Sequence, residues 1–164
     1  MAGLPGSGKS TVARQVSLAL SVPILSVDPI EAAMWSAGIP RESTGIAAYT
    51  VACAVAREQL GLGLSVIVDA VNPVEAAREM WRALAREQGV RLVIIECICS
   101  DTRVHRERVQ ERKRTIPGMA EVTGERVEDR RREYEPWADD RLVLDTAHSL
   151  EDVAEVAVAH TRSS

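Results

Sequence analysis

The chain has 164 residues, the length of one domain with a substantial core, and we expect residues 1–164 to form a single domain. Hydrophobic residues make up 46% and charged residues 27%, and the net charge of −4 gives no global field that would draw the molecule to nucleic acid or a membrane surface. Because the chain shows no secretory leader and no apolar run near the ~20 residues that span a bilayer, we expect a cytoplasmic location.

Apolar runs alternate with stretches of helical period along the chain. The runs predict strands at 24–28, 64–69, 91–99 and 141–145, and the stretches predict helices at about 10–21, 29–37, 43–61, 73–88, 101–114, 124–135 and 149–161. Such alternation favours an α/β fold in three layers, a parallel sheet with helices on both faces. Ligands bind these sheets at the carboxyl edge of the strands.

Polar residues at three predicted helix starts are typical of N-caps. Asp28 and Asn72 are each followed directly by proline, which is favoured at the first helical position. Ser149 precedes the last predicted helix in a similar way. These caps would place helix N-termini along one edge of the sheet.

The segment Gly3-Leu4-Pro5-Gly6-Ser7-Gly8-Lys9-Ser10 matches the phosphate-loop pattern G-x-x-x-x-G-K-[ST] in full. Glycines allow several backbone N–H groups to converge on a phosphate chain, and the helix that follows adds its N-terminal dipole. Lys9 would reach the β- and γ-phosphates of a nucleoside triphosphate, and the Ser10 hydroxyl would ligate Mg²⁺. The expected nucleotide-binding residues of this segment are Gly3, Pro5, Gly6, Ser7, Gly8, Lys9, Ser10 and Thr11.

The rest of the sequence narrows the class of phosphate-loop protein. The guanine-specificity motif of GTPases is absent, and the chain is short for an AAA+ ATPase. ATPases that activate water usually carry Glu directly after the Asp that closes a strand, whereas Ala70 follows Asp69 here. A small kinase fits these features, because its nucleophile is a substrate hydroxyl.

Five features together resemble the small P-loop kinases, within them the branch that holds the polynucleotide 5′-kinases, the zeta-toxin kinases and the chloramphenicol phosphotransferases. The features are the phosphate loop, Asp28 after the next strand, the segment 66–72, an Arg-rich stretch and a late Tyr134-Glu135-Pro136. The resemblance implies an adenylate-kinase-like core with parallel strand order 2-3-1-4-5.

The resemblance also implies roles for two carboxylates. Asp28 would accept the proton of the substrate hydroxyl, although the same residue is well placed as a helix cap. Asp69 would hold Mg²⁺ together with Ser10, with an ordinary strand-end carboxylate as the alternative.

An Arg-rich lid over residues 101–118 follows from the same resemblance. Arg108 and Arg112 would bind the nucleotide and Arg112 would act in catalysis, because guanidinium groups neutralise the charge of the transferred phosphoryl group. A solvated charged helix is the alternative. We expect His105 on the surface, and Arg78 either on the surface or in the site.

We therefore expect an ATP- and Mg²⁺-dependent kinase that phosphorylates a hydroxyl of a small-molecule acceptor. A nucleotide-binding regulator without efficient transfer and a polynucleotide 5′-hydroxyl kinase remain alternatives. Glu31 stands where polynucleotide kinases place Arg, which argues against an anionic nucleic-acid acceptor. The sequence carries no linear signature of the acceptor, of an ATP or GTP preference, or of an oligomeric state.

The phosphate-loop motif normally follows a buried strand, and only Met1 and Ala2 precede Gly3. In the order 2-3-1-4-5 that strand is the middle of the sheet, so Met1 and Ala2 would supply only its last rung. We therefore expect the natural reading frame to start upstream of Met1 and to encode an apolar strand there.

Overall fold

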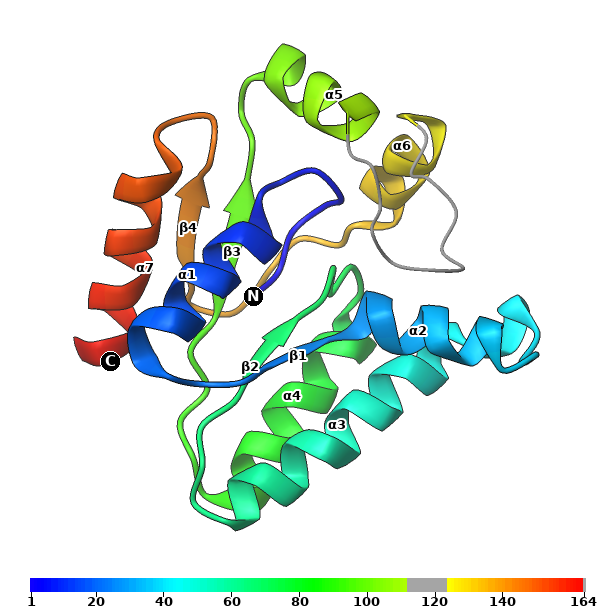
Figure 1. The fold of residues 1–164 in the computed structure, drawn as a ribbon, viewed down its shortest axis with the longest axis vertical. Helices are drawn as coiled ribbons and strands as arrows, with labels where there is room; N and C mark the ends of the chain where they lie inside the picture. The colour runs from blue at the N-terminus through cyan, green and yellow to red at the C-terminus, as the bar shows by residue number, and fades with distance from the viewer. Residues whose placement is uncertain (112–123, 164) are drawn as a thin grey trace.

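The computed structural model describes residues 1–111 and 124–163 and has the expected α/β architecture (Figure 1). The strands are β1 (Ile24–Ser26), β2 (Ile67–Asp69), β3 (Ile95–Ile98) and β4 (Leu142–Asp145). The described helices are α1 (Lys9–Leu20), α2 (Val27–Ser36), a 3₁₀ turn (Arg41–Ser43), α3 (Gly45–Gly61), α4 (Glu75–Gln88), α5 (Thr102–Glu111), α6 (Gly124–Glu133) and α7 (Leu150–Ser163).

The four strands form two parallel pairs. β1 pairs with β2, with Ser26 opposite Asp69, and β3 pairs with β4, with Ile98 opposite Asp145. Both pairs therefore bring a strand-end carboxylate to the carboxyl edge, where the sequence predicts ligands to bind.

Residues 1–3 join the two pairs. The Met1 amine donates to the Val68 carbonyl at 2.7 Å, and the Ala2 N–H donates to the Ile95 carbonyl at 2.8 Å. The Cys97 N–H returns a bond to the Ala2 carbonyl at 2.9 Å. Residues 1–3 thus lie between β2 and β3, the place that the order 2-3-1-4-5 gives to the first strand. The full five-stranded order remains a prediction, since the described strands form two separate sheets.

Helices cover both faces of these strands. One core cluster contains Val68 and residues of α3 and α4, and the other contains Ile67 and residues of α1 and α7. Because successive strand residues point to opposite faces, Ile67 and Val68 place the two clusters on opposite sides of β2. Figure 1 shows the corresponding helix pairs, α1 beside α7 and α3 beside α4.

A cavity of about 230 Å³ lies between β2 and β3, next to Met1 and the residues that precede the two strands. Its walls include Ser65, Val66, Trp81, Leu84, Leu92 and Val93. β2 and β3 are both shorter than the predicted strands 64–69 and 91–99. Ser65, Val66 and residues 91–94, which fall outside β2 and β3, border the cavity, and Leu92 is 40% exposed.

Two predicted helix caps are wrong. α2 begins at Val27 with Ser26 at its N-cap, so Asp28 lies inside the first turn of the helix instead of at the end of a strand. α4 begins at Glu75 after Val74, and Asn72 has a left-handed φ of 52°. The Asn72 amide is engaged elsewhere, because it accepts from Trp81 Nε1 at 2.9 Å and donates to the Met1 carbonyl. The predicted cap at Ser149 is confirmed by a bond from the Asp152 N–H at 3.4 Å.

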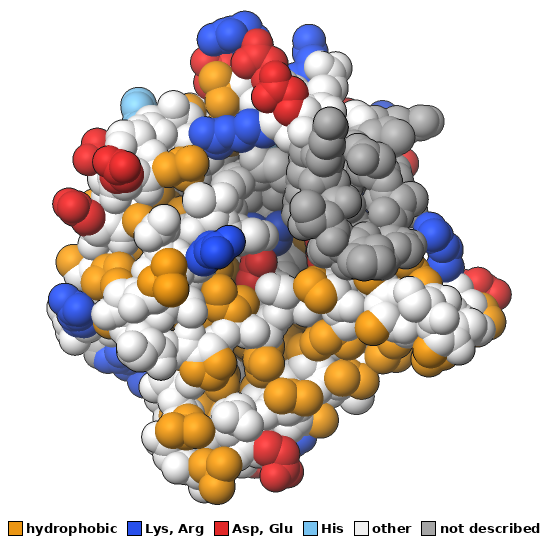
Figure 2. Space-filling view, viewed as in Figure 1, with side chains coloured by type: hydrophobic (Ala, Val, Ile, Leu, Met, Phe, Trp, Pro, Cys, Tyr) orange, Lys and Arg blue, Asp and Glu red, His pale blue; other side chains and the backbone are white. Residues whose placement is uncertain are grey.

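The outer surface is apolar in one region. Figure 2 shows hydrophobic side chains gathered over α3 and the turn after it, where Ile46 and Leu62 are 76% and 73% exposed. None of the helices in the described part of the chain is both long and apolar enough to cross a membrane.

Candidate nucleotide-binding site

The phosphate loop runs from the short rung at residues 1–3 into α1. Gly3 has φ 137°, and a Cβ on this residue would lie 2.2 Å from the Cys97 carbonyl oxygen. Only glycine therefore fits at this position, where the start of the loop lies against the backbone of β3. Gly8 forms the left-handed N-cap of α1, so the loop ends directly at a helix N-terminus, which favours anions.

The phosphate loop buries two polar side chains. Lys9 is 4% exposed and Ser7 is 2% exposed, and the Ser7 hydroxyl has no hydrogen-bond partner within the described residues. A buried hydroxyl that is left unpaired costs free energy, which a phosphate oxygen would recover on binding. Ser10 and Thr11 follow on the first turn of α1 and are exposed to solvent.

Asp69, at the end of β2, also has a buried polar atom without a hydrogen-bond partner in the described part of the chain. The residue is 7% exposed, and its Oδ1 has no partner in the described part of the chain, while its Oδ2 accepts from the Ser26 hydroxyl at 3.5 Å. The charges of Asp69 and Lys9 both affect the pKa of the Met1 amine. Burial lowers the pKa of that amine, and the Asp69 charge opposes the shift while the Lys9 charge adds to it. Both charged groups therefore lie within electrostatic range of one buried amine.

Mg²⁺ fits this donor set. The ion prefers oxygen ligands, keeps several waters and usually takes only one or two protein ligands besides substrate phosphates. The free Asp69 oxygen and the Ser10 hydroxyl supply oxygens of this kind, as the sequence predicts.

Asp28 faces a different group of residues. It is half-buried on α2, and its charge acts on Tyr49 of α3. The pKa of the Tyr49 phenol is raised to about 12, mainly by burial, and the charges of Asp28 and Glu31 contribute to this rise. The Asn72 N–H, which donates to the Tyr49 hydroxyl at 3.0 Å, opposes that rise. Two carboxylates of α2 thus lie on the side of the molecule where Tyr49 and Asn72 meet.

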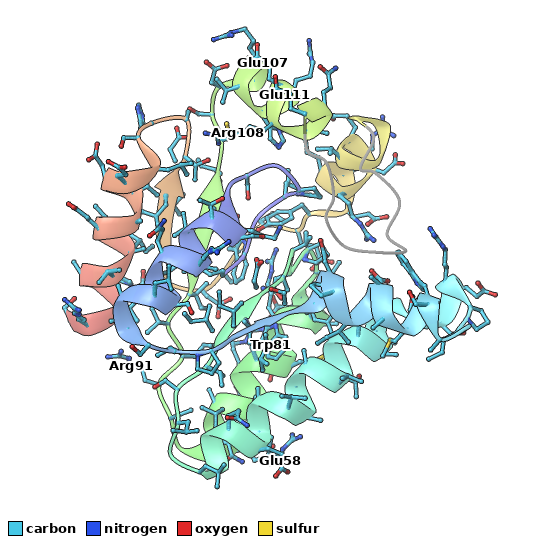
Figure 3. The ribbon with its side chains drawn as sticks, viewed as in Figure 1. Glu58, Trp81, Arg91, Glu107, Arg108 and Glu111 are labelled. Carbon is cyan, nitrogen blue, oxygen red and sulfur yellow. The ribbon has the colours of Figure 1, made fainter. Side chains whose placement is uncertain are left out.

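α5 contacts the phosphate loop directly, which the sequence analysis missed. His105 is buried, so the expectation of a surface position is wrong, and its Nε2 lies 2.8 Å from the Pro5 carbonyl oxygen. Arg108 donates to Thr146 Oγ1 and to the Thr146 carbonyl, both at 2.8 Å. In Figure 3 Arg108 lies on the side of α5 toward this loop, whereas Glu107 and Glu111 lie on the outer side.

Arg78 lies inside the protein, so the surface alternative is wrong. It is 2% exposed and donates to the carbonyls of Asn72, Pro73, Glu135 and Pro136 at 2.6–3.2 Å. Its guanidinium also lies 3.9 Å from the ring centroid of Trp137. These four hydrogen bonds compensate the buried charge and hold the segment after α6 against the start of α4. A buried Arg has no linear signature, because its carbonyl partners come from two distant segments.

The predicted lid is described only as far as Glu111. Arg112 and the remainder of 101–118 lie outside the described residues, so the role of Arg112 stays a prediction.

Comparisons with known proteins agree with the phosphate-loop fold. A family model described as an AAA domain (AAA_33) matches residues 1–137. No curated protein gives a significant match.

Three solved structures illustrate the similarity. A putative kinase from Chloroflexus aurantiacus has a TM-score of 0.76 at 20% identity, over 99% of this chain and 93% of its own. The Mycobacterium tuberculosis APS kinase CysC in complex with AMPPNP and APS has a TM-score of 0.73 at 20% identity, over 98% and 94%. A gluconokinase from Sinorhizobium meliloti has a TM-score of 0.71 at 21% identity, over 99% and 89%. At these identities the likeness concerns the fold.

Proposed function

The chain belongs to the AAA_33 family of AAA domains, a kinase-like group of P-loop NTPases, and on that premise we propose that it is an ATP-dependent kinase acting on a hydroxyl of a small molecule. The observation that carries the proposal is the set of unpartnered buried groups at one edge of the sheet. Ser7 Oγ and Asp69 Oδ1 lack protein partners within the described residues, and Lys9, in the same loop as Ser7, is buried.

Each of these residues has a task in the proposed reaction. Lys9 and the amides of the phosphate loop hold the β- and γ-phosphates. Asp69 and Ser10 would hold Mg²⁺, which when bound supplies positive charge to the phosphate oxygens. Transfer joins the acceptor oxygen to the γ-phosphorus and releases ADP, and the hydroxyl proton passes to the Asp28 carboxylate.

One feature favours a hydroxyl acceptor over water, and a second bears on the charge of that acceptor. Ala70, which follows Asp69, is 1% exposed and offers no side chain that could activate a water molecule. Asp28 lies on α2, near Tyr49, where Glu31 adds a second carboxylate. Two negative charges favour an acceptor that is not itself anionic at this end. The fold neighbours include an APS kinase and a gluconokinase, whose names state small-molecule acceptors.

The test is a transfer screen from ATP labelled in its γ-phosphate, across sugars, nucleosides, antibiotics, amino-sugar nucleotides and RNA 5′ ends. We expect label on one small-molecule class. Label on RNA ends would instead assign a polynucleotide kinase, and tight MgATP binding with no transfer to any acceptor would assign a regulator.

Asp28→Asn sharpens the test. If Asp28 is the base, this variant binds MgATP as the wild type does, and transfer falls by roughly 10²-fold or more. Calorimetry measures the affinity alongside the transfer rate. A drop in melting temperature, with a rate that follows only the folded fraction, would assign Asp28 a structural role in the first turn of α2.

A further inference from the structure

We propose that His105 and Thr146 are positioning residues that fix two peptide planes of the phosphate loop, so that the amides of Gly6 and Gly8 face the bound phosphates. The inference depends on phosphate binding by the loop and is independent of the acceptor and of the transfer step.

The first plane is fixed by α5. His105 Nε2 lies 2.8 Å from the Pro5 carbonyl oxygen. A carbonyl oxygen can only accept, so the imidazole carries hydrogen on Nε2 and donates it. A trans peptide unit is planar, with its C=O and N–H pointing in opposite directions. Holding the Pro5 carbonyl toward α5 therefore turns the Gly6 N–H away from α5.

The second plane is fixed from the end of β4. The Thr146 hydroxyl donates to the Ser7 carbonyl at 2.8 Å, and by the same geometry this bond turns the Gly8 N–H away from Thr146. The hydroxyl has a single hydrogen, which either the Ser7 carbonyl at 2.8 Å or the Ile98 carbonyl at 3.1 Å can accept, the Ser7 carbonyl being the nearer. Arg108 Nη1 donates to the hydroxyl oxygen at 2.8 Å. Arg108 therefore orients the hydroxyl so that its hydrogen points at the carbonyl acceptors, and α5 acts on both planes.

Packing at Gly6 leaves the loop little freedom to turn. A Cβ at Gly6 would lie 2.7 Å from Val109 Cγ2 and 3.0 Å from His105 Cδ2, so α5 fits flush against this residue. His105 and Thr146 are 7% and 0% exposed, which shields both bonds from water. Within the described residues neither the Gly6 nor the Gly8 amide donates to a protein acceptor. The two fixed planes thus hold two unpaired donors for an anion.

The functional value of this arrangement is preorganisation. A loop whose amides already converge loses less conformational freedom when it binds phosphate.

The experiment measures the binding of inorganic tripolyphosphate and of MgATP by calorimetry. Tripolyphosphate has no nucleoside, so its affinity reports on phosphate binding without a contribution from the adenine or the ribose. His105→Phe removes the donor and keeps a planar ring, whereas His105→Gln keeps a side-chain N–H donor. Thr146→Val removes the hydroxyl at nearly constant shape, and Thr146→Ser restores it.

We expect His105→Phe and Thr146→Val each to weaken both ligands by about tenfold, the order of one hydrogen bond. His105→Gln and Thr146→Ser should recover most of the affinity. Gln110→Ala, on an exposed position of α5, is the matched control and should bind as the wild type does. Tripolyphosphate affinity within twofold of the wild type in folded His105→Phe and Thr146→Val would overturn the proposal. Equal losses in the rescue variants, in step with lowered melting temperatures, would also overturn it, since they would indicate a role in folding alone.

Discussion

Four apolar residues fused ahead of Met1 are expected to enter the cavity between β2 and β3 and to stabilise the protein. Residues 1–3 already bond to Val68 on one side and to Ile95 and Cys97 on the other. A chain that continues backwards from Met1 runs parallel to residues 65–68, which form one wall of the cavity. Val-Leu-Ile-Val suits this position, because β-branched and apolar residues fit a buried strand.

The size of the effect follows from the cavity. At about 24 cal/mol per Å³ of empty volume, a fully enclosed cavity of 230 Å³ would correspond to ~5 kcal/mol of lost stability, which is an upper bound because this cavity is partly open to solvent. Ordering four residues costs about 4–8 kcal/mol, and ladder hydrogen bonds of about 1 kcal/mol each to both neighbours offset that cost. A net gain of at most ~5 kcal/mol would raise the melting temperature by at most roughly 10–20 °C, at about 2–4 °C per kcal/mol for a domain of this size.

Thermal and urea unfolding of the fused and unfused proteins measure this gain. A Gly-Ser-Gly-Ser extension is the matched control, since it also converts the buried Met1 amine, whose pKa is lowered by burial, into a neutral amide but fills no volume. A Ser-Pro-Ser-Pro extension lacks the N–H groups for a ladder. If either control raises the melting temperature as much as Val-Leu-Ile-Val does, or if none does, the cavity does not accept a strand.

Three further substitutions test residues of the site and its support. Lys9→Ala should abolish transfer and weaken triphosphate binding, because the phosphate charge loses its buried partner; wild-type turnover would remove the phosphate-loop assignment. Arg112→Ala should lower kcat more than it raises KM for ATP, as expected of a charge that acts on the transition state, and equal damage from Arg106→Ala would indicate diffuse electrostatics. Arg78→Met should lower the free energy of unfolding by about 3 kcal/mol in urea titrations, because four carbonyls lose their donor; Arg78→Lys should recover little of it, and an unchanged midpoint would contradict the structural role.

The phosphate loop and the parallel pairing could be predicted because their causes are local. Glycine spacing decides where backbone can approach a phosphate, and near-continuous apolar runs indicate buried parallel strands. Asp69 was found in the same way, as the polar residue that ends such a run.

Helix boundaries depend on contacts that the sequence does not display. Asp28 reads as a cap beside proline, yet β1 ends at Ser26 and the helix starts at Val27. Asn72 reads as a cap too, but Trp81 and Met1 bind its amide from distant segments. At Asn72 a tertiary arrangement decided between local alternatives.

His105 was missed because its burial depends on where α5 docks. One signal was present, since His105 and Val109 are four residues apart and share the face of α5 that packs on the loop. In an Arg-rich helix two such residues are a weak signal. Their packing against Gly6 shows that they form the contact face of α5.

The two core clusters imply an order of events during synthesis on the ribosome. The cluster around Ala52 and Trp81 draws its residues from 25–84, a continuous stretch that can pack while the rest is being translated. The other cluster joins α1 to α7, so it must wait for residues close to the carboxyl end. Because β3, β4 and α1 in this second cluster flank the phosphate loop, a nascent chain gains its nucleotide site at the last step of folding, after most of the polypeptide has emerged.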